Sequence, residues 1–165
     1  KMELPYEAPN CPRIPSIEEI NKELEPFARS WAGGYTCRID NFLVKKGYHP
    51  GIIQEAETML FLQNIRGMRV PKVYTAFRSF DETYQCDAYF FVAKIVKGEV
   101  LDLAKWMGFN EQVKQLIGSK IATQFKIMRS IPSEGFYGTV QHGSWPHYTH
   151  GLCSRYKKPC GPYES

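Results

Sequence analysis

The sequence predicts an α+β fold, in which helices pack against a small antiparallel sheet. The predicted elements follow the order helix, strand, strand, helix, strand, strand, helix, helix, which is typical of an α+β domain. The chain has 165 residues, of which 43% are hydrophobic, so it is long enough for one domain with its own core. We expect an extended arm over residues 1–15, a folded domain over 16–140 and an irregular tail over 141–165.

The first elements are an arm and a helix. Residues 1–14 contain three prolines and show no period, which predicts extended chain. Ser16 followed three residues later by Glu19 fits a capping box, which predicts the start of a helix. Helical spacing then extends that helix from Ile17 to Ser30, and Gly33–Gly34 would end it. The apolar residues at this spacing are Ile17, Ile20, Leu24 and Phe27.

A hairpin and a second helix come next. Tyr35–Ile39 and Phe42–Lys46 are predicted strands, and Asp40–Asn41 between them has the composition of a tight turn. After a loop that contains a proline, apolar spacing predicts a helix over Ile52–Arg66, with Gly67 at its end. These elements place a lysine-ended strand directly before an amphipathic helix.

Two further strands follow that helix. The first is predicted over Val70–Phe77, and Pro71 puts it at a sheet edge or at the beginning of the strand. The polar segment Ser79–Gln85 predicts a turn, and the aromatic-rich segment Cys86–Val96 predicts the second strand. We expect the aromatic residues Tyr89, Phe90 and Phe91 in this strand, and Trp106 beyond it, to lie in the core.

The last predicted elements are two helices. A short one is expected over Val100–Met107, and Asn110 is a good N-cap for a longer one over Glu111–Arg129. After Ile131–Pro132 the chain is dense in Gly, Pro, His, Tyr and Cys, and no helix is predicted. The apolar residues on one face of the longer helix are Val113, Leu116, Ile117, Ile121, Phe125 and Met128.

Composition argues against several classes of protein. The net charge is +4, and the Lys and Arg residues form no basic stripe, so nucleic-acid binding is not expected. No apolar run reaches the roughly 18 residues of a membrane span, and the N-terminus shows no signal peptide, so we expect a cytoplasmic protein.

Cysteines and histidines do not predict a metal site. The five cysteines contain no C-x-x-C pair, and we expect Cys37 and Cys86 to be buried thiols. A loose group of histidines with Cys153 occupies the tail, and we interpret its members as polar loop residues. The histidines of this group are His142, His147 and His150.

One pair of charged residues is a candidate binding site. Lys45 ends an apolar strand, and Glu55 lies near the start of the next helix. A strand lysine paired with a helix glutamate holds the α/β-phosphates in protein-kinase-like folds. Lys46 is the alternative lysine because neighbouring residues of a strand point to opposite faces, and Glu57 is the alternative acid. The two lysines could also be solvated charges at the end of a strand. The two glutamates could be first-turn acids that the helix dipole favours.

Several short segments in order resemble a known family. They are Val44-Lys45-Lys46-Gly47, Glu55-Ala56-Glu57, Val70-Pro71-Lys72-Val73-Tyr74, Gly98-Glu99-Val100-Leu101, Gly135-Phe136-Tyr137-Gly138 and the terminal Gly161-Pro162-Tyr163. Together they resemble the N-terminal lobe of aminoglycoside phosphotransferase and choline-kinase-like proteins, most closely the fungal branch. The resemblance covers most of the chain from about Cys37 onward.

The resemblance implies roles for individual residues. Lys45 would face the phosphates of ATP, since the family spaces this lysine one residue before a glycine, and Glu55 would hold it. The backbone from Val92 to Ile95 would read the adenine, with Lys94 where the family often has an acid. ATP and Mg²⁺ would be the cofactors. The sequence has no G-x-G-x-x-G, and Gly33–Gly34 is the only candidate phosphate loop.

The family's catalytic residues have no counterpart here. The catalytic loop H-G-D-x-x-x-x-N and the later I-D-W/F segment are absent, and His142-Gly143-Ser144 has serine in place of aspartate. We therefore expect an ATP-binding lobe that is not an active kinase on its own and relies on a missing C-lobe. The alternatives are a lone lobe that binds a small molecule, a non-kinase enzyme such as a cyclase in fungal secondary metabolism, or an interaction module. An uncovered apolar surface would then favour a homo-oligomer.

Overall fold

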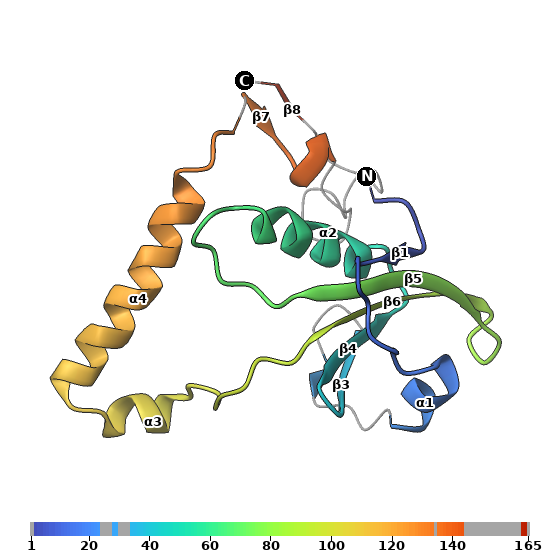
Figure 1. Cartoon of the computed structure of the whole chain (residues 1–165), viewed down its shortest axis with the longest axis horizontal. Coiled ribbons are helices and arrows are strands. Elements are labelled where there is room, and N and C mark those ends of the chain that lie inside the picture. The colour runs from blue at the N-terminus through green and yellow to red at the C-terminus, as the bar shows by residue number, and fades with distance from the viewer. Residues whose placement is uncertain (1, 24–27, 30–33, 134, 144–162, 165) are drawn as a thin grey trace, which may run out of the picture.

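The fold is α+β, and the described residues form an open antiparallel sheet and four helices (Figure 1). A computed structural model describes residues 2–23, 28–29, 34–133, 135–143 and 163–164. The strand order in the sheet is β1-β5-β6-β4-β3-β2, and each neighbouring pair is antiparallel. The strands are β1 (Tyr6–Glu7), β2 (Ala28–Arg29), β3 (Tyr35–Ile39), β4 (Phe42–Gly47), β5 (Val73–Asp81) and β6 (Cys86–Lys94).

The core lies on both faces of the sheet, and β6 contributes to each. Side chains alternate along a strand, so Phe91 and Ala93 face helix α2 (Gly51–Gln63), and Phe90 and Val92 face the other side. On that other side Ile20 of α1 (Ile17–Lys22) is fully buried against them. The expectation of core aromatic residues is confirmed for Phe90 and Phe91, each 1% exposed, whereas Tyr89 and Trp106 are only half-buried.

The beginning of α1 was predicted correctly and its end was not. Ser16 Oγ accepts from the backbone N–H of Glu19, and the Glu19 carboxylate accepts from the backbone N–H of Ser16. The helix ends at Lys22 rather than at Ser30, and Ala28–Arg29 is strand β2. A proline follows at position 26, and it disfavours helical backbone in the residue before it. Gly33 is outside the described residues, and Gly34 directly precedes β3.

The N-terminal arm joins the sheet. Strand β1 pairs with β5, and the hydroxyl of Thr75 donates to the carbonyl of Tyr6 at 2.7 Å. The sequence predicts only extended chain here, because a two-residue strand carries no periodic signal. Without β1, β5 would be a sheet edge.

The central elements match the predicted order with shifted ends. Helix α2 stops at Gln63 rather than Arg66, and β5 begins after Pro71 and runs on to Asp81. The predicted hairpin of β3 and β4 is confirmed, with Asp40 at a positive φ of 50° in its turn. The proline sits before the strand because it has no N–H to give to the ladder.

Helices α3 (Leu103–Gly108) and α4 (Glu111–Arg129) lie apart from the sheet (Figure 1). The bounds of α4 and its cap are confirmed, since Asn110 Oδ1 accepts from the N–H of Val113 at 2.9 Å. The short helix α3 begins at Leu103 rather than Val100, after an Asp102 cap. The apolar face of α4 is largely open, and its exposed members are Leu116, Ile121, Phe125 and Met128.

The remaining described elements are small. Strands β7 (Phe136–Tyr137) and β8 (Tyr163–Glu164) pair with each other, and η1 (Val140–His142) is a single 3₁₀ turn. Residues 144–162 of the predicted tail are outside the described residues.

The close approach of β4 to α2 yields a first prediction. A Cβ added at Gly47 would lie 2.7 Å from Ile52 Cγ1 and 3.4 Å from Gly34 Cα. Gly47→Ala should therefore lower the free energy of unfolding by about 1–3 kcal/mol. Urea denaturation followed by circular dichroism measures this, with Gly118→Ala as the control. A Cβ at Gly118 meets no atom within 4 Å, so the control should be neutral or stabilising by about 0.5–1 kcal/mol. Equal urea midpoints for the two variants would show that a side chain at Gly47 causes no clash between β4 and α2.

Candidate functional site

The Lys45 side chain lies on the face of the sheet that α2 covers. In the ladder Lys45 is opposite Thr36 of β3 and Phe91 of β6, and residues that lie opposite each other share a face. Phe91 packs against α2, so the lysine points toward that helix. There its ammonium donates to the Glu55 carboxylate. The lysine side chain is 18% exposed and that of the glutamate 45%, so the pair remains accessible to a ligand.

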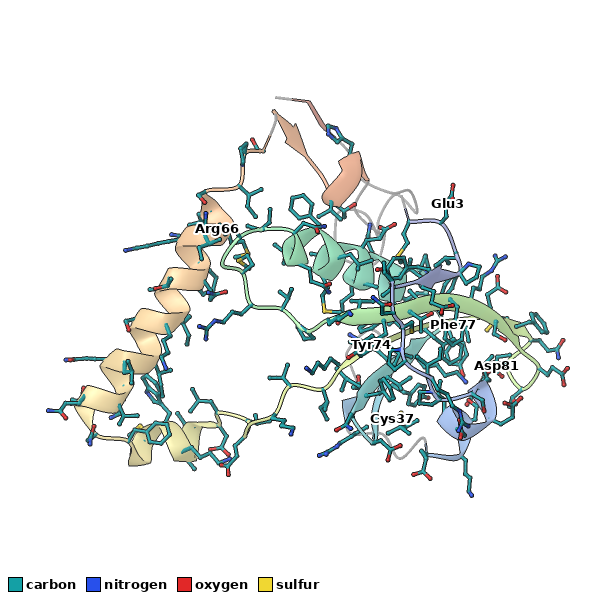
Figure 2. All side chains as sticks on the ribbon, viewed as in Figure 1. Glu3, Cys37, Arg66, Tyr74, Phe77 and Asp81 are labelled. Carbon is teal, nitrogen blue, oxygen red and sulfur yellow. The ribbon has the colours of Figure 1, made fainter. Side chains whose placement is uncertain are left out.

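Lys46 points to the opposite face and is a structural residue. It lies opposite Phe90, and only 5% of the residue is exposed. Its ammonium donates to Asp81 Oδ2 at 2.7 Å and to Asn21 Oδ1 at 3.3 Å. These contacts join the end of β5 to α1, and Figure 2 shows Asp81 near that helix. Strand alternation thus separates the two candidate lysines, which the sequence left as alternatives.

The environment of Lys46 shifts two pKa values. The hydrogen bond from Lys46 is the largest cause that lowers the pKa of Asp81 below its ordinary value. Tyr48 donates to the same Asp81 oxygen at 3.0 Å. Burial, followed by this hydrogen bond, raises the pKa of the Tyr48 phenol well above its ordinary value. The cluster therefore favours an ionised aspartate and a neutral tyrosine, which is a structural arrangement rather than a reactive one.

Glu57, the alternative acid, is used elsewhere. Its Oε1 accepts from the backbone N–H of Met2 at 2.5 Å, and the residue is 8% exposed. It lines an open groove of about 480 Å³ between the N-terminal arm and α2, together with Glu3 and Glu7. Neither Lys45 nor Glu55 lines this groove, and its three carboxylates make it unsuited to a phosphate ligand.

The segment expected to read adenine lies at the end of β6. Val92 is fully buried, with its backbone in the ladders to β4 and β5, and Lys94 is exposed. The N–H of Lys94 donates to the carbonyl of Lys72 at 2.7 Å, and that of Ile95 to Asn41 at 3.0 Å. An exposed linker then runs from Val96 to α3, and Val96 itself is 69% exposed.

The structure adds one neighbour that the sequence did not predict. Gln54, next to Glu55 on α2, donates from Nε2 to the hydroxyl of Thr139 at 3.1 Å. This contact brings the segment that contains η1 against α2. The two residues are 85 positions apart, so no local pattern in the sequence could have indicated their contact.

The described part of the chain offers neither a metal-binding cluster nor a membrane-spanning helix. Within it, no three or more His, Cys, Asp or Glu side chains come together in a way that could hold a metal ion. Of the predicted tail group only His142 is described, and His147, His150 and Cys153 fall outside. Cys37 is buried, as expected, and Cys86 is half-buried. Among the described helices, none is long and apolar enough to span a lipid bilayer.

Comparison with models of known protein families, with curated proteins and with solved structures gives no match for this chain.

The Lys46 cluster predicts an acid dependence of stability. Because the pKa of Asp81 is lowered in the folded state, its contribution is present above the unfolded-state pKa near 3.9 and is lost as pH falls through the lower folded value. Asp81→Asn should lower the free energy of unfolding by about 3–5 kcal/mol at pH 7 and by progressively less below pH 4.

Chemical denaturation between pH 7 and pH 3 measures this dependence. Asp87→Asn is the control, since the ion pair of Asp87 with Arg78 is exposed and should contribute about 1 kcal/mol or less. A cost for Asp81→Asn that is small at pH 7, or that stays constant down to pH 3, would show that the ion pair does not stabilise the fold.

Proposed function

We propose that this chain binds a nucleoside triphosphate, with Lys45 contacting the phosphates and Glu55 holding the lysine in place. The observation that carries the proposal is the ion pair between these two residues at the junction of β4 and α2. Lys45 is a cation on a central strand, accessible from the α2 face, and its ammonium group is directed toward the Glu55 carboxylate.

The chemistry of the ammonium group supports this role. An ammonium has three donors, and Glu55 takes one of them, so the other donors can meet phosphate oxygens. A partly exposed ion pair contributes only about 0–1 kcal/mol to stability. The fold is therefore expected to depend little on this pair, in contrast to the buried pair of Lys46.

The arrangement of strands supports a finer proposal, that the sheet is a kinase-like N-terminal lobe. Strands β2, β3 and β4 are neighbours in chain order, and Lys45 lies on the third of them. Gly33–Gly34 lies in the connection between the first two. Protein-kinase-like folds carry the phosphate lysine on a third strand, pair it with a glutamate on the next helix, and cover the phosphates with a glycine-rich loop.

The proposed position of the adenine contact depends on which backbone groups after β6 are already hydrogen-bonded. The N–H groups of Lys94 and Ile95 already donate to Lys72 and Asn41. Within the described chain, Val96 and Lys97 make no backbone–backbone hydrogen bond, and both are exposed. We therefore place the adenine contact at Val96–Lys97, one step beyond the segment that the sequence suggested.

The proposal is confined to binding. Phosphoryl transfer also needs carboxylates that hold Mg²⁺ and a residue that orients the acceptor hydroxyl. The site described here supplies a lysine and the glutamate that positions it. ATP with Mg²⁺ is the proposed ligand. Lys45 would contact its phosphates and backbone groups its adenine, and no side chain of the proposed site would be specific for the base.

Replacement of Lys45 tests the proposal. Lys45→Met removes the charge-assisted hydrogen bonds to phosphate and should weaken ATP affinity about 10- to 100-fold, as measured by isothermal titration calorimetry with Mg²⁺. Lys22→Met is the matched control, because this lysine lies on α1, which packs on the opposite face of the sheet, and should leave the affinity unchanged.

Two outcomes would contradict nucleotide binding. One is a wild-type protein that does not bind ATP with or without Mg²⁺, and the other is a Lys45→Met variant that binds as well as Lys22→Met. Binding of an apolar small molecule without any response to ATP would favour the alternative function, a lone lobe adapted to another ligand.

A further inference from the structure

Helix α4 is joined to the loop that follows α2 by one glutamine. Gln124 Nε2 donates to the carbonyl of Gly67 at 3.1 Å, and Gln124 Oε1 accepts from the N–H of Arg69 at 2.9 Å. A single side-chain amide thus satisfies one backbone carbonyl and one backbone N–H of the loop, as a neighbouring strand would. Figure 2 shows Arg66 of this loop where α4 approaches it.

Gly67 gives the joint its shape. Its φ is +88°, a conformation that side chains other than glycine adopt at a cost. A Cβ at this position would lie 3.1 Å from Ile127 Cδ1, which belongs to the turn of α4 after Gln124. The helix and the loop are therefore in direct contact as well as hydrogen-bonded.

The loop is connected to α2 through consecutive hydrogen bonds. Backbone N–H groups of Asn64, Ile65 and Met68 donate to carbonyls three residues earlier, at 3.2, 3.0 and 3.1 Å. On the far side of the loop, Gln63 Nε2 donates to the carbonyl of Pro71 at 2.9 Å. The loop is therefore hydrogen-bonded to α2 on both of its sides, which gives a physical route from α4 to the helix that carries Glu55.

We propose that Gln124 is a positioning residue that couples α4 to α2 and so sets the Lys45–Glu55 pair. The effect on nucleotide affinity rests on the proposed function, whereas the effect on α2 does not. No residue of α4 is buried, and its apolar face is largely exposed. Few contacts hold this helix in place, so the loss of these two hydrogen bonds should free α4 from the loop, and the loop should then loosen against α2.

Hydrogen exchange with peptide-level mass spectrometry tests the coupling on the full chain without nucleotide. Gln124→Met keeps the bulk of the side chain and removes both hydrogen bonds. Exchange should rise about tenfold in the loop 64–72 and also in α2, residues 51–63. Gln115→Met is the matched control on the same helix, since Gln115 is exposed and makes no described side-chain hydrogen bond, and it should leave both segments unchanged.

A second replacement separates coupling from a local structural role. Gln124→Glu sets a carboxylate oxygen against the carbonyl of Gly67, where the amide donated, and the two oxygens repel each other. Exchange in residues 64–72 should therefore rise at least as much as in Gln124→Met, and exchange in α2 should rise with it. Faster exchange confined to α4 and residues 64–72, with α2 unchanged, would overturn the proposal. So would an equal response to Gln115→Met.

Titration with Mg-ATP then connects the joint to the site. Gln124→Met should weaken affinity several-fold in proportion to the change in α2 exchange, and Gln115→Met should not. If the wild-type protein binds no ATP, the proposed function fails, but the exchange experiment still decides the coupling. If it binds ATP and Gln124→Met binds equally well despite faster α2 exchange, the coupling does not reach the Lys45–Glu55 pair and the proposal is overturned.

Discussion

The alternation of side chains along β4 is the constraint on which the rest of the site depends. Two adjacent lysines must point to opposite faces of the sheet. One therefore enters the buried cluster with Asp81, and the other meets Glu55 beside α2. A one-residue slip of β4 would exchange the two lysines between these faces. The buried pair of Lys46, together with the core residue Phe90 opposite it, holds the strand in register and thereby aims Lys45.

The fold was predictable where the signal is local. The Asn110 cap and apolar spacing gave the bounds of α4, and the turn residues gave the hairpin of β3 and β4. The predicted end of α1 was wrong because apolar residues continue at helical spacing past Lys22. The proline at position 26 was the stronger signal, and it indicates an earlier end of the helix. Strand β1 has only two residues, and its pairing with β5 spans about 70 positions. Such pairing leaves no periodic trace.

The site was predictable in part for the same reason. Lys45 and Glu55 are ten residues apart on consecutive elements, so their pairing could be expected from the sequence. The partners of Lys46 are Asn21 and Asp81, which lie 25 and 35 positions away. Those of Gln124 lie more than 50 positions away, so only the folded chain brings these residues together. The exposure of the apolar face of α4 was not predictable either, because an apolar stripe at helical spacing is typical of a helix that packs this face against a core.

The claim that Lys45 faces the phosphates of a bound nucleotide is tested most directly by labelling the lysine that lies beside them. An ATP analogue with an acyl group on its terminal phosphate transfers that group to a nearby amine, and mass spectrometry locates the acylated residue. If a nucleotide binds on the face of the sheet that α2 covers, Lys45 should be acylated in preference to Lys46, and excess Mg-ATP should suppress the acylation. Acylation of other lysines at equal rates, or acylation of Lys45 that ATP does not suppress, would contradict the claim that this face of the sheet binds a nucleotide.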